Sequence, residues 1–369
     1  MKDRKFSISR FSVPILFIAI CIIGIIIAKP ELSFISGELA RRMVRNTFLV
    51  LSLIIPIKAG MGINFGIPLG AMAGQIGLVF VTDWGITGPL GLLVAGAIGT
   101  PIAIILGLFS GRVLNRARGR EMITSMMLSF LTLGIYMLFL LYLCGSIVPF
   151  RSNEIILSQG YGIKNSILLK VAGGFDNIIN FNINAGPLAI NVPVVTILLI
   201  AALAVFITWF TNTKLGHDMS AVGHDQNVST NAGLQTDKIR VQSIVISTVL
   251  ACYGQIIYLQ NIGTLNTYAG QDQTALYAAA SLLVGGASVS KASIPNAIFG
   301  TALFHLMFII MPQAGKALTG DAMIGEFFRT FLCYGVVTLA LIMHAYERTK
   351  AERKERENSF NEEITVQAK

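Results

Sequence analysis

Side chains that could carry out bond chemistry are scarce in this sequence and are not grouped. It contains no HExxH helix, no GxSxG turn and no Cys/His cluster with the spacing of a metal site. The four histidines are His217, His224, His305 and His344. His217 and His224 share one polar segment, where we interpret them as solvated or interface residues. The sequence therefore predicts no catalytic residue, no metal ligand and no directly bound cofactor.

The segment Gly285–Ala292 (GGASVSKA) comes closest to a nucleotide-binding loop. Such a loop cradles phosphates with glycine amides and supplies a lysine and a Mg²⁺-binding hydroxyl. Here Ser290 stands in place of the second glycine and Ala292 in place of the final Ser or Thr. We reject it as a Walker A motif. If ATP drives this protein, ATP and Mg²⁺ are expected on another subunit.

Neutral polar residues and glycines within apolar runs are the candidates for lining a solute path. They are Asn64, Gln75, Ser125, Ser129, Gln255, Asn261, Gly285 and Gly286. Interhelical hydrogen bonds, worth about 0.6 kcal/mol each, are the alternative role for the polar members of this set. Carboxylates are nearly absent from the apolar runs, whereas ion-coupled carriers commonly place an ionisable group near the bilayer midplane. Their absence disfavours a secondary transporter.

Four glycines, Gly62, Gly66, Gly70 and Gly74, repeat every four residues. On one helix they would form a flat stripe that allows close approach of a second backbone. Pro68 lies within this series and would interrupt the helical hydrogen bonds, as happens beside translocation paths. Packing and lining are both consistent with the pattern.

The composition identifies the surroundings of these residues. The chain has 369 residues, of which 54% are hydrophobic and 13% are charged. A soluble domain carries about 25% charged residues, so this chain is suited to a bilayer rather than to water. Its net charge of +9 fits the positive-inside rule, and no basic cluster interleaved with aromatic residues points to nucleic acid.

A spanning helix needs about 20 mostly apolar residues. Seven clear candidates are 11–28, 87–109, 123–147, 191–211, 240–260, 294–313 and 326–346. The run 47–81 is long enough for two crossings but is punctuated by glycine and proline, and 272–289 is a weaker run that either crosses fully or forms a broken helix. We predict an all-α polytopic membrane bundle of about ten helices, some of them short or broken.

The distribution of Lys and Arg residues predicts that both ends of the chain lie in the cytoplasm. Most of the 28 Lys and Arg residues fall in segments on that side, including the tails 1–10 and 347–369 and the loop 212–240. The basic segment 29–45 lies on the predicted outer side, and we interpret it as an amphipathic helix along the headgroups. The longest outer loop is 148–190. The transmembrane domain is expected over 11–346.

The stretch Thr213–Thr236 (TKLGHDMSAVGHDQNVSTNAGLQT) resembles the cytoplasmic loop of permease subunits from bacterial ABC importers of the ribose, nucleoside and branched-chain amino acid class. The residues that carry this resemblance are Leu215, Gly216, Ala221, Val222, Gly223, Ala232 and Gly233. Three further segments agree in order: GGAS at Gly285–Ser288, the run Glu121–Phe130, and Gly74-Gln75. Together they cover about residues 60–346. Asp225 stands where that class usually has Asn, and Ser129 where its nucleoside branch has Asn.

The resemblance implies a transport subunit without enzymatic activity, located in the bacterial inner membrane. Residues 217–234 would form a short coupling helix that docks on an ATPase subunit, with Asp225 offering a polar contact. A second permease subunit, identical or homologous, and an extracytoplasmic solute-binding protein would complete the importer. A nucleoside or simple sugar is the expected solute. The alternatives are a branched-chain amino acid permease and an ion-coupled secondary transporter.

Overall fold

The computed structural model describes residues 8–150, 152, 154–185, 188–339 and 342, without side chains for 8–12 and 182–189. The tail 347–369 and most of the tail 1–10 lie outside the described residues. Helices in the first half are α1 Ile8–Ala28, α2 Leu32–Ser52, α3 Ile54–Lys58, α4 Ile67–Asp83, α5 Gly88–Arg116 and α6 Glu121–Leu138, which is followed by a π-helical turn, η1 Phe139–Leu143. The second half contains α7 Val194–Thr211, α8 Lys214–His224, α9 Gln226–Asn231, α10 Thr236–Ile262, α11 Thr274–Val284, α12 Ile294–Thr319 and a helix over Ala322–Leu339.

Within the described residues, six helices are long and apolar enough to cross a membrane: α5, α6 with η1, α7, α10, α12 and Ala322–Leu339. The apolar part of α1, α4 and α11 are shorter. A helical membrane bundle is therefore confirmed. The weak run 272–289 holds only the eleven residues of α11, because the chain leaves helical geometry at Gly285 and Gly286.

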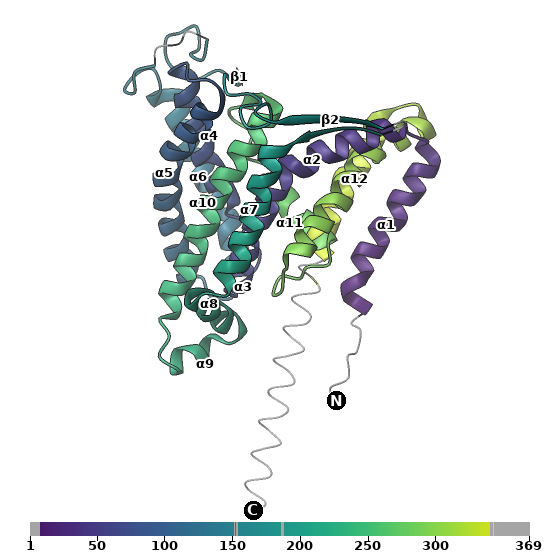
Figure 1. The fold of residues 1–369 in the computed structure, drawn as a ribbon. Coiled ribbons are helices and arrows are strands. Elements are labelled where there is room, and N and C mark those ends of the chain that lie inside the picture. Colours follow the sequence, from purple (N-terminus) through teal and green to yellow (C-terminus); the bar gives the residue numbers. More distant parts are fainter. Residues whose placement is uncertain (1–7, 151, 153, 186–187, 340–341, 343–369) are drawn as a thin grey trace, which may run out of the picture.

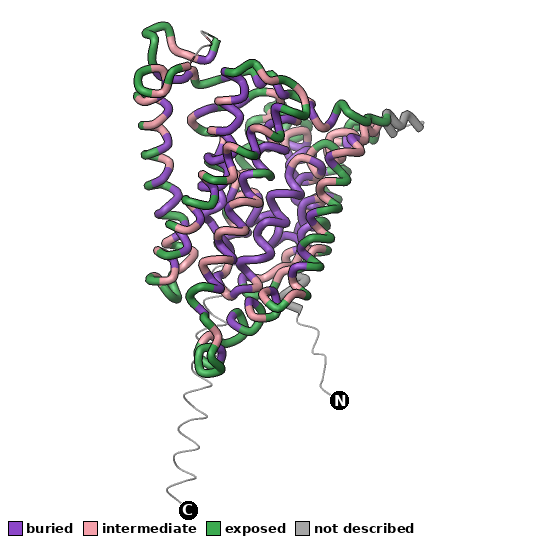
Figure 2. Tube along the Cα trace, turned by 60° about the vertical axis from the view of Figure 1, so that its left-hand side comes forward, coloured by how far each residue is buried: buried purple, intermediate pink, exposed green. Residues whose placement is uncertain are grey.

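Helix α10 lies at the centre of the bundle and packs against α2, α4 and α5. More than half of the most apolar stretch of α10 and of α12 is buried, against a third or less in α5 and α7. Figure 2 shows the same gradient, with buried residues concentrated on the inner helices and exposed ones around the periphery. The outer helices therefore present the apolar side chains that lipid would cover.

Two glycines of the four-residue series provide the contact between α4 and α10. A Cβ on Gly70 would lie 2.2 Å from the carbonyl oxygen of Thr248, and one on Gly74 would lie 2.7 Å from that of Cys252. The single stripe of four is wrong, however. Gly62 has a φ of +69° and precedes the helix, and Gly66 is its N-cap. Pro68 does not interrupt α4 but lies in its first turn, where proline is tolerated.

The basic segment 29–45 is not a helix of its own. From Leu32 on it forms the first part of α2, which continues without a break to Ser52. Residues 46–52 of α2 are all buried. Two of its basic side chains have partners nearby. Arg42 pairs with Glu38 at 2.8 Å, and the Arg45 guanidinium lies 5.4 Å from the centre of the Tyr258 ring. A helix can thus enter the core with its basic end still at the surface.

Four short strands correct the all-α prediction. β1 Ser166–Leu168 pairs antiparallel with β4 Thr264–Asn266, and β2 Asn180–Ala185 forms a hairpin with β3 Leu188–Pro193. In Figure 1 the strands lie at the end of the bundle opposite α8 and α9, and the hairpin reaches across the top of α2. The alternation NFNINA in β2 has the period of two that is typical of a strand.

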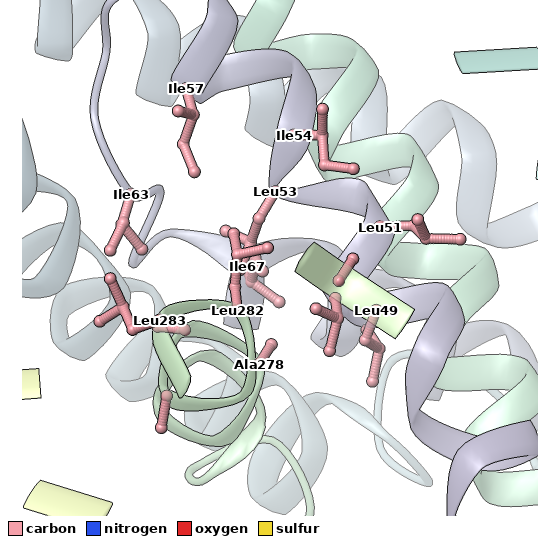
Figure 3. Close-up of a cluster of buried hydrophobic side chains, with 14 of the residues drawn as sticks. Leu49, Leu51, Leu53, Ile54, Ile57, Ile63, Ile67, Ala278, Leu282 and Leu283 are labelled. Carbon is pink, nitrogen blue, oxygen red and sulfur yellow. The ribbon is translucent and has the colours of Figure 1, made fainter. Parts of the chain in front are cut away.

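The largest apolar cluster surrounds the point where α2 bends into α3. Figure 3 shows Leu49 of α2, Leu53 at the junction and Ile57 of α3 in one cluster with Ile67 of α4 and Leu282 of α11. All five are buried. Residues 59–66 form an irregular connection from α3 to α4 beside this cluster, so the run 47–81 is interrupted at Leu53 and again over 59–66.

Candidate solute cavity and cytoplasmic coupling surface

The segment expected to form one coupling helix consists of two, α8 and α9, which meet at Asp225. The Asp225 carboxylate accepts hydrogen bonds from the backbone amides of Asn227 (2.8 Å) and Val228 (3.0 Å) and thereby caps α9. Gly233 has a φ of +85°, and the amide of Leu234 donates to the carbonyl of Ser229 at 3.0 Å. This left-handed ending is typical of a helix C-terminus. Local sequence therefore defines both ends of α9.

Two of the predicted coupling glycines face the protein's own transmembrane part. A Cβ on Gly216 would lie 2.2 Å from the carbonyl oxygen of Phe210, and one on Gly223 would lie 2.1 Å from that of Lys58. Met219 and Val222 are buried on the same side of α8. Helix α8 is thus packed onto the ends of α3, α7 and α10.

The opposite side of this elbow is open. Ala221, Asp225, Ala232 and Gly233 are exposed, whereas Leu215 is half-buried. Val228 of α9 is 63% exposed although it is apolar. Figure 1 shows α8 and α9 protruding from the end of the bundle where α1 begins.

Three of the predicted solute-path residues make hydrogen bonds inside the protein. The Asn64 side chain accepts from the Gly66 amide (2.9 Å) and donates to the Ser247 hydroxyl (3.3 Å). Ser129 donates to the carbonyl of Phe65 at 2.9 Å. Ser125 donates to the carbonyl of Met122, within its own helix, at 2.8 Å.

Gln75 and Gln255 are only half satisfied. The Tyr136 hydroxyl donates to Gln75 Oε1 at 2.8 Å, and Gln255 Nε2 donates to the carbonyl of Gly270 at 3.2 Å. Gln75 Nε2 and Gln255 Oε1 are buried and have no partner among the described residues. These two glutamines therefore keep hydrogen-bonding capacity in the core.

The last three predicted solute-path residues, Asn261, Gly285 and Gly286, have different structural roles. The Asn261 side chain donates to Asp176 at 2.7 Å, near the outer end of α10. A Cβ on Gly285 would lie 1.9 Å from the carbonyl oxygen of Asn296, so this glycine allows α11 and α12 to approach. Gly286 has a φ of +82° and turns the chain out of α11.

A cavity of about 240 Å³ lies between α2, α10, α11, α12 and the connection 263–273. Polar side chains on its lining are Asn46, Tyr258, Thr264, Asn266, Gln273, Thr274, Tyr277, Ser281 and His305. The lining residues Ile262, Thr264, Asn266, Ala269 and Gln273 are exposed, and we call them the rim. The floor consists of buried residues: Asn46, Leu49, Val50, Leu259, Ala278, Ser281 and His305.

None of the eight predicted solute-path residues lines this cavity. Two of the eight lie beside the lining residue Gly270, whose carbonyl oxygen accepts a hydrogen bond from Gln255. A Cβ on Gly270 would also lie 3.0 Å from Gln75 Nε2. The sequence did contain a signal for the cavity, because Ser281 and His305 are polar residues within apolar helices.

The chain was compared with known proteins. The profile of the family described as branched-chain amino acid transport system, permease component, matches residues 38–343. The chain belongs to this permease family. It is also 24% identical over 320 residues to the nucleoside ABC transporter permease protein NupB of Lactococcus lactis, an alignment that covers 83% of this chain and 77% of that protein. No solved structure matches.

This membership confirms the resemblance read from the cytoplasmic loop and the three other segments. The chain is a permease subunit of an ABC importer and a multi-pass protein of the cytoplasmic membrane. It is a transport subunit, and ATP hydrolysis belongs to a separate subunit of such importers.

The permease has a second, larger space at the end of the bundle near α9. This space of about 640 Å³ is lined by the 60–62 connection, the turn between α5 and α6, and Gln226 of α9. Beside it, Arg240 of α10 donates to the lining residue Glu121 of α6 at 2.6 Å. Arg240 is fully buried, so this ion pair fixes the start of α10 against the start of α6.

The charged residues near the smaller cavity of the permease lie beside its lining and are not part of it. Among the described lining residues, none carries a carboxylate or a guanidinium group. Asp272 lies beside the lining residue Gln273 in the connection before α11, and partial burial raises the pKa of its carboxyl group. The lining itself is suited to uncharged ligands.

Proposed function

We propose that this permease imports a small neutral polar solute, with a nucleoside or a simple sugar as the first choice. Its partners would be ATPase subunits that bind ATP and Mg²⁺, a second permease subunit and an extracytoplasmic binding protein. The similarity to a protein named as a nucleoside permease supports this solute class.

The observation that carries the proposal is the elbow of α8 and α9. One side of it is fixed to the transmembrane helices through Gly216 and Gly223. The other side presents Ala221, Val228 and Ala232 beyond the end of the bundle. A small apolar surface on a rigidly held helix pair can transmit force, because a displacement of the docked subunit moves α3, α7 and α10 with it.

Ten crossings with both ends in the cytoplasm complete the proposal. The crossings are α1, α2 with α3, α4, α5, α6, α7, α10, α11, α12 and Ala322–Leu339. Figure 1 supports this order, since α8 and α9 lie at the end of the bundle where α1 begins and the strands lie at the opposite end. The binding protein would then dock on the strand-bearing face, which includes most of 148–190.

Co-purification tests the coupling surface. Val228→Asp should reduce the amount of ATPase subunit recovered with the detergent-extracted permease at least tenfold, because it places a charge in an apolar contact. Val228→Leu keeps the apolar surface and should recover the ATPase as the natural chain does. Both variants should leave the thermal midpoint unchanged, since Val228 is mostly exposed.

Gly223 is a poor position for this test. A side chain there would press on the Lys58 carbonyl of the same chain, so loss of the ATPase would not separate docking from folding. If Val228→Asp retains the ATPase in full, the elbow is not the docking surface. Uptake that follows a proton gradient and ignores ATP would instead favour the ion-coupled carrier.

The solute class is tested by competition for ATP-driven uptake in proteoliposomes with the cognate binding protein. Uridine and D-ribose are expected to compete, and L-leucine is not. Competition by L-leucine alone would favour the branched-chain amino acid alternative.

A further inference from the structure

The cavity floor contains polar groups that the protein itself does not satisfy. Ser281 Oγ and both ring nitrogens of His305 are buried and have no hydrogen-bond partner among the described residues. Ser281 is fully buried and His305 is 3% exposed. Buried polar groups are almost always hydrogen-bonded, because an unmet donor or acceptor costs free energy. Both side chains line the same cavity, so a molecule bound there could supply their hydrogen bonds.

From these groups we infer that the cavity is a binding site within a single permease subunit for an uncharged ring compound that carries hydroxyl or amide groups. This inference rests on the proposed function. The bound molecule would exchange hydrogen bonds with Ser281 and His305 at the floor. Its other end would meet Asn266 and Gln273 at the rim.

The size of the cavity limits the ligand to one small ring compound. Its volume of about 240 Å³ lies just below the span of roughly 300–1,000 Å³ that is usual for small-molecule sites. An oligosaccharide or a peptide would not fit inside it. Tyr258 and Tyr277 line it as well, and Phe308 holds the Tyr277 ring in an edge-on contact at 4.9 Å between ring centres. Such fixed aromatic rings give a sugar or base ring a flat surface to pack on.

The charged groups that act on the floor are basic and do not favour cations. The charged groups that act on His305 are the guanidinium groups of Arg42, Arg45 and Arg329. Their positive field disfavours Na⁺ and the ammonium group of an amino acid. Two of these arginines are already paired, Arg42 with Glu38 and Arg329 with Glu326, and Arg45 lies over Tyr258. No guanidinium lines the cavity, so an anion would find no direct partner there either.

The cavity opens on the side from which a binding protein would deliver solute. Its rim follows the outer end of α10 and includes Thr264 and Asn266 of β4, which pairs with β1 of the outer loop. The same connection is tied to the outer loop by Thr267, whose hydroxyl donates to the carbonyl of Lys164 at 2.9 Å. Solute that enters at the rim reaches Ser281 and His305 without crossing the packed core.

Saturation-transfer NMR on the full-length permease in nanodiscs tests the inference, because it detects weak binding at millimolar solute. Uridine and D-ribose are the probes, with L-leucine and uridine monophosphate as the charged comparisons. Uridine alone or both neutral probes should bind, and the result distinguishes a site for the whole nucleoside from a site for the sugar. Ser281→Ala and His305→Leu should each weaken binding about tenfold.

Thr301→Val is the matched control. Thr301 is buried on α12 one turn before His305, but its hydroxyl donates to Ala297 of its own helix and does not line the cavity. Its binding constant should equal that of the natural chain. His305→Gln, which keeps hydrogen-bonding atoms, should bind more tightly than His305→Leu. This difference separates loss of a contact from loss of folding.

Unchanged binding in Ser281→Ala and His305→Leu would overturn the inference, as would a natural chain that binds neither neutral probe. Binding of L-leucine or uridine monophosphate in their place would overturn the ligand class. These outcomes can be distinguished from a failure of the proposed function, since Val228 lies outside the cavity. A permease that recovers its ATPase but has no cavity ligand loses only this inference, and one that binds uridine but recovers no ATPase loses only the coupling proposal.

Discussion

Polar side chains occur in two parts of the buried interior, and the protein treats them differently. Between α4, α6 and α10, Asn64 and Ser129 are hydrogen-bonded to groups of neighbouring segments, whereas Gln75 and Gln255 each make one hydrogen bond and keep one buried side-chain atom without a partner among the described residues. Around the cavity at α11 and α12, Ser281 and His305 have no partner among the described residues. Both sets look alike in the sequence, as isolated polar residues in apolar runs. Asn64 and Ser129 therefore join neighbouring segments, whereas Ser281 and His305 are the groups that the proposed ligand would satisfy.

The largest effect is expected at the buried ion pair between Glu121 of α6 and Arg240 of α10, which lies away from the cavity at α11 and α12. Glu121→Gln should lower the free energy of unfolding by about 4 kcal/mol, because it leaves Arg240 buried without a counter-charge. Thermal unfolding in detergent measures this change. Asp237→Asn is the control, since its partner Arg118 is at the same end of the protein and both side chains are exposed. That pair should contribute at most about 1 kcal/mol. Equal losses in the two variants would show that water reaches Arg240.

The next effect concerns the backbone contact that forms the cavity wall. Gly300→Ala would place a methyl group 2.0 Å from the carbonyl oxygen of Ser281 and should destabilise the permease by about 3 kcal/mol. It should also weaken uridine binding, because α11 and α12 must separate. Gly134→Ala is the control, since a Cβ at Gly134 on α6 meets nothing within 4 Å. Binding and stability that both survive Gly300→Ala would contradict the close packing of these helices.

A smaller loss is expected where a satisfied hydrogen bond is removed. Asn64→Leu should lower stability by about 2 kcal/mol, because it strands the Gly66 amide in the core. The same variant should leave the uridine affinity unchanged, since Asn64 does not line the cavity. Differential scanning fluorimetry and the NMR titration measure the two quantities. A variant that keeps its stability and loses uridine binding would move Asn64 from the structural set to the solute path.

The smallest effect on stability is expected at the cavity around α11 and α12. Ser281→Ala should change the thermal midpoint little or raise it, because it removes a buried hydroxyl that has no partner. Ser129→Ala is the comparison, since it removes a bonded hydroxyl and should cost about 1 kcal/mol. If Ser281→Ala is the more destabilising of the two, the hydroxyl is satisfied inside the protein and the contrast between the two regions fails.

Much of the fold could be predicted from the sequence because the bilayer imposes a simple rule. Long apolar runs such as 240–260 and 294–313 became α10 and α12 with only their ends moved. The rule failed for 29–45, where basic residues suggested a helix of its own, because from Leu32 on these residues continue into the fully buried end of α2 at 46–52. It also missed the strands at 180–193. Water at the outer face permits extended backbone there, which the apolar core does not.

The candidate sites show the same division. The limits of α9, in the segment proposed for coupling, could be predicted because local residues define them, Asp225 at its start and Gly233 at its end. The solute path could not. Ser129 meets the carbonyl of Phe65, 64 residues away, and Asn64 meets Ser247, 183 residues away. No local sequence pattern predicts hydrogen-bond partners that are so far apart in the chain.

The sequence by itself determined a helical membrane bundle of the permease family and the limits of the short helix α9. Apolar length, charge bias and cap residues act within a few helical turns, so they can be read along the chain. Only the tertiary structure decided which polar residues are satisfied and which line the cavity. A hydrogen bond between helices depends on where two distant segments meet, and at His305 and Ser281 they meet around an open space.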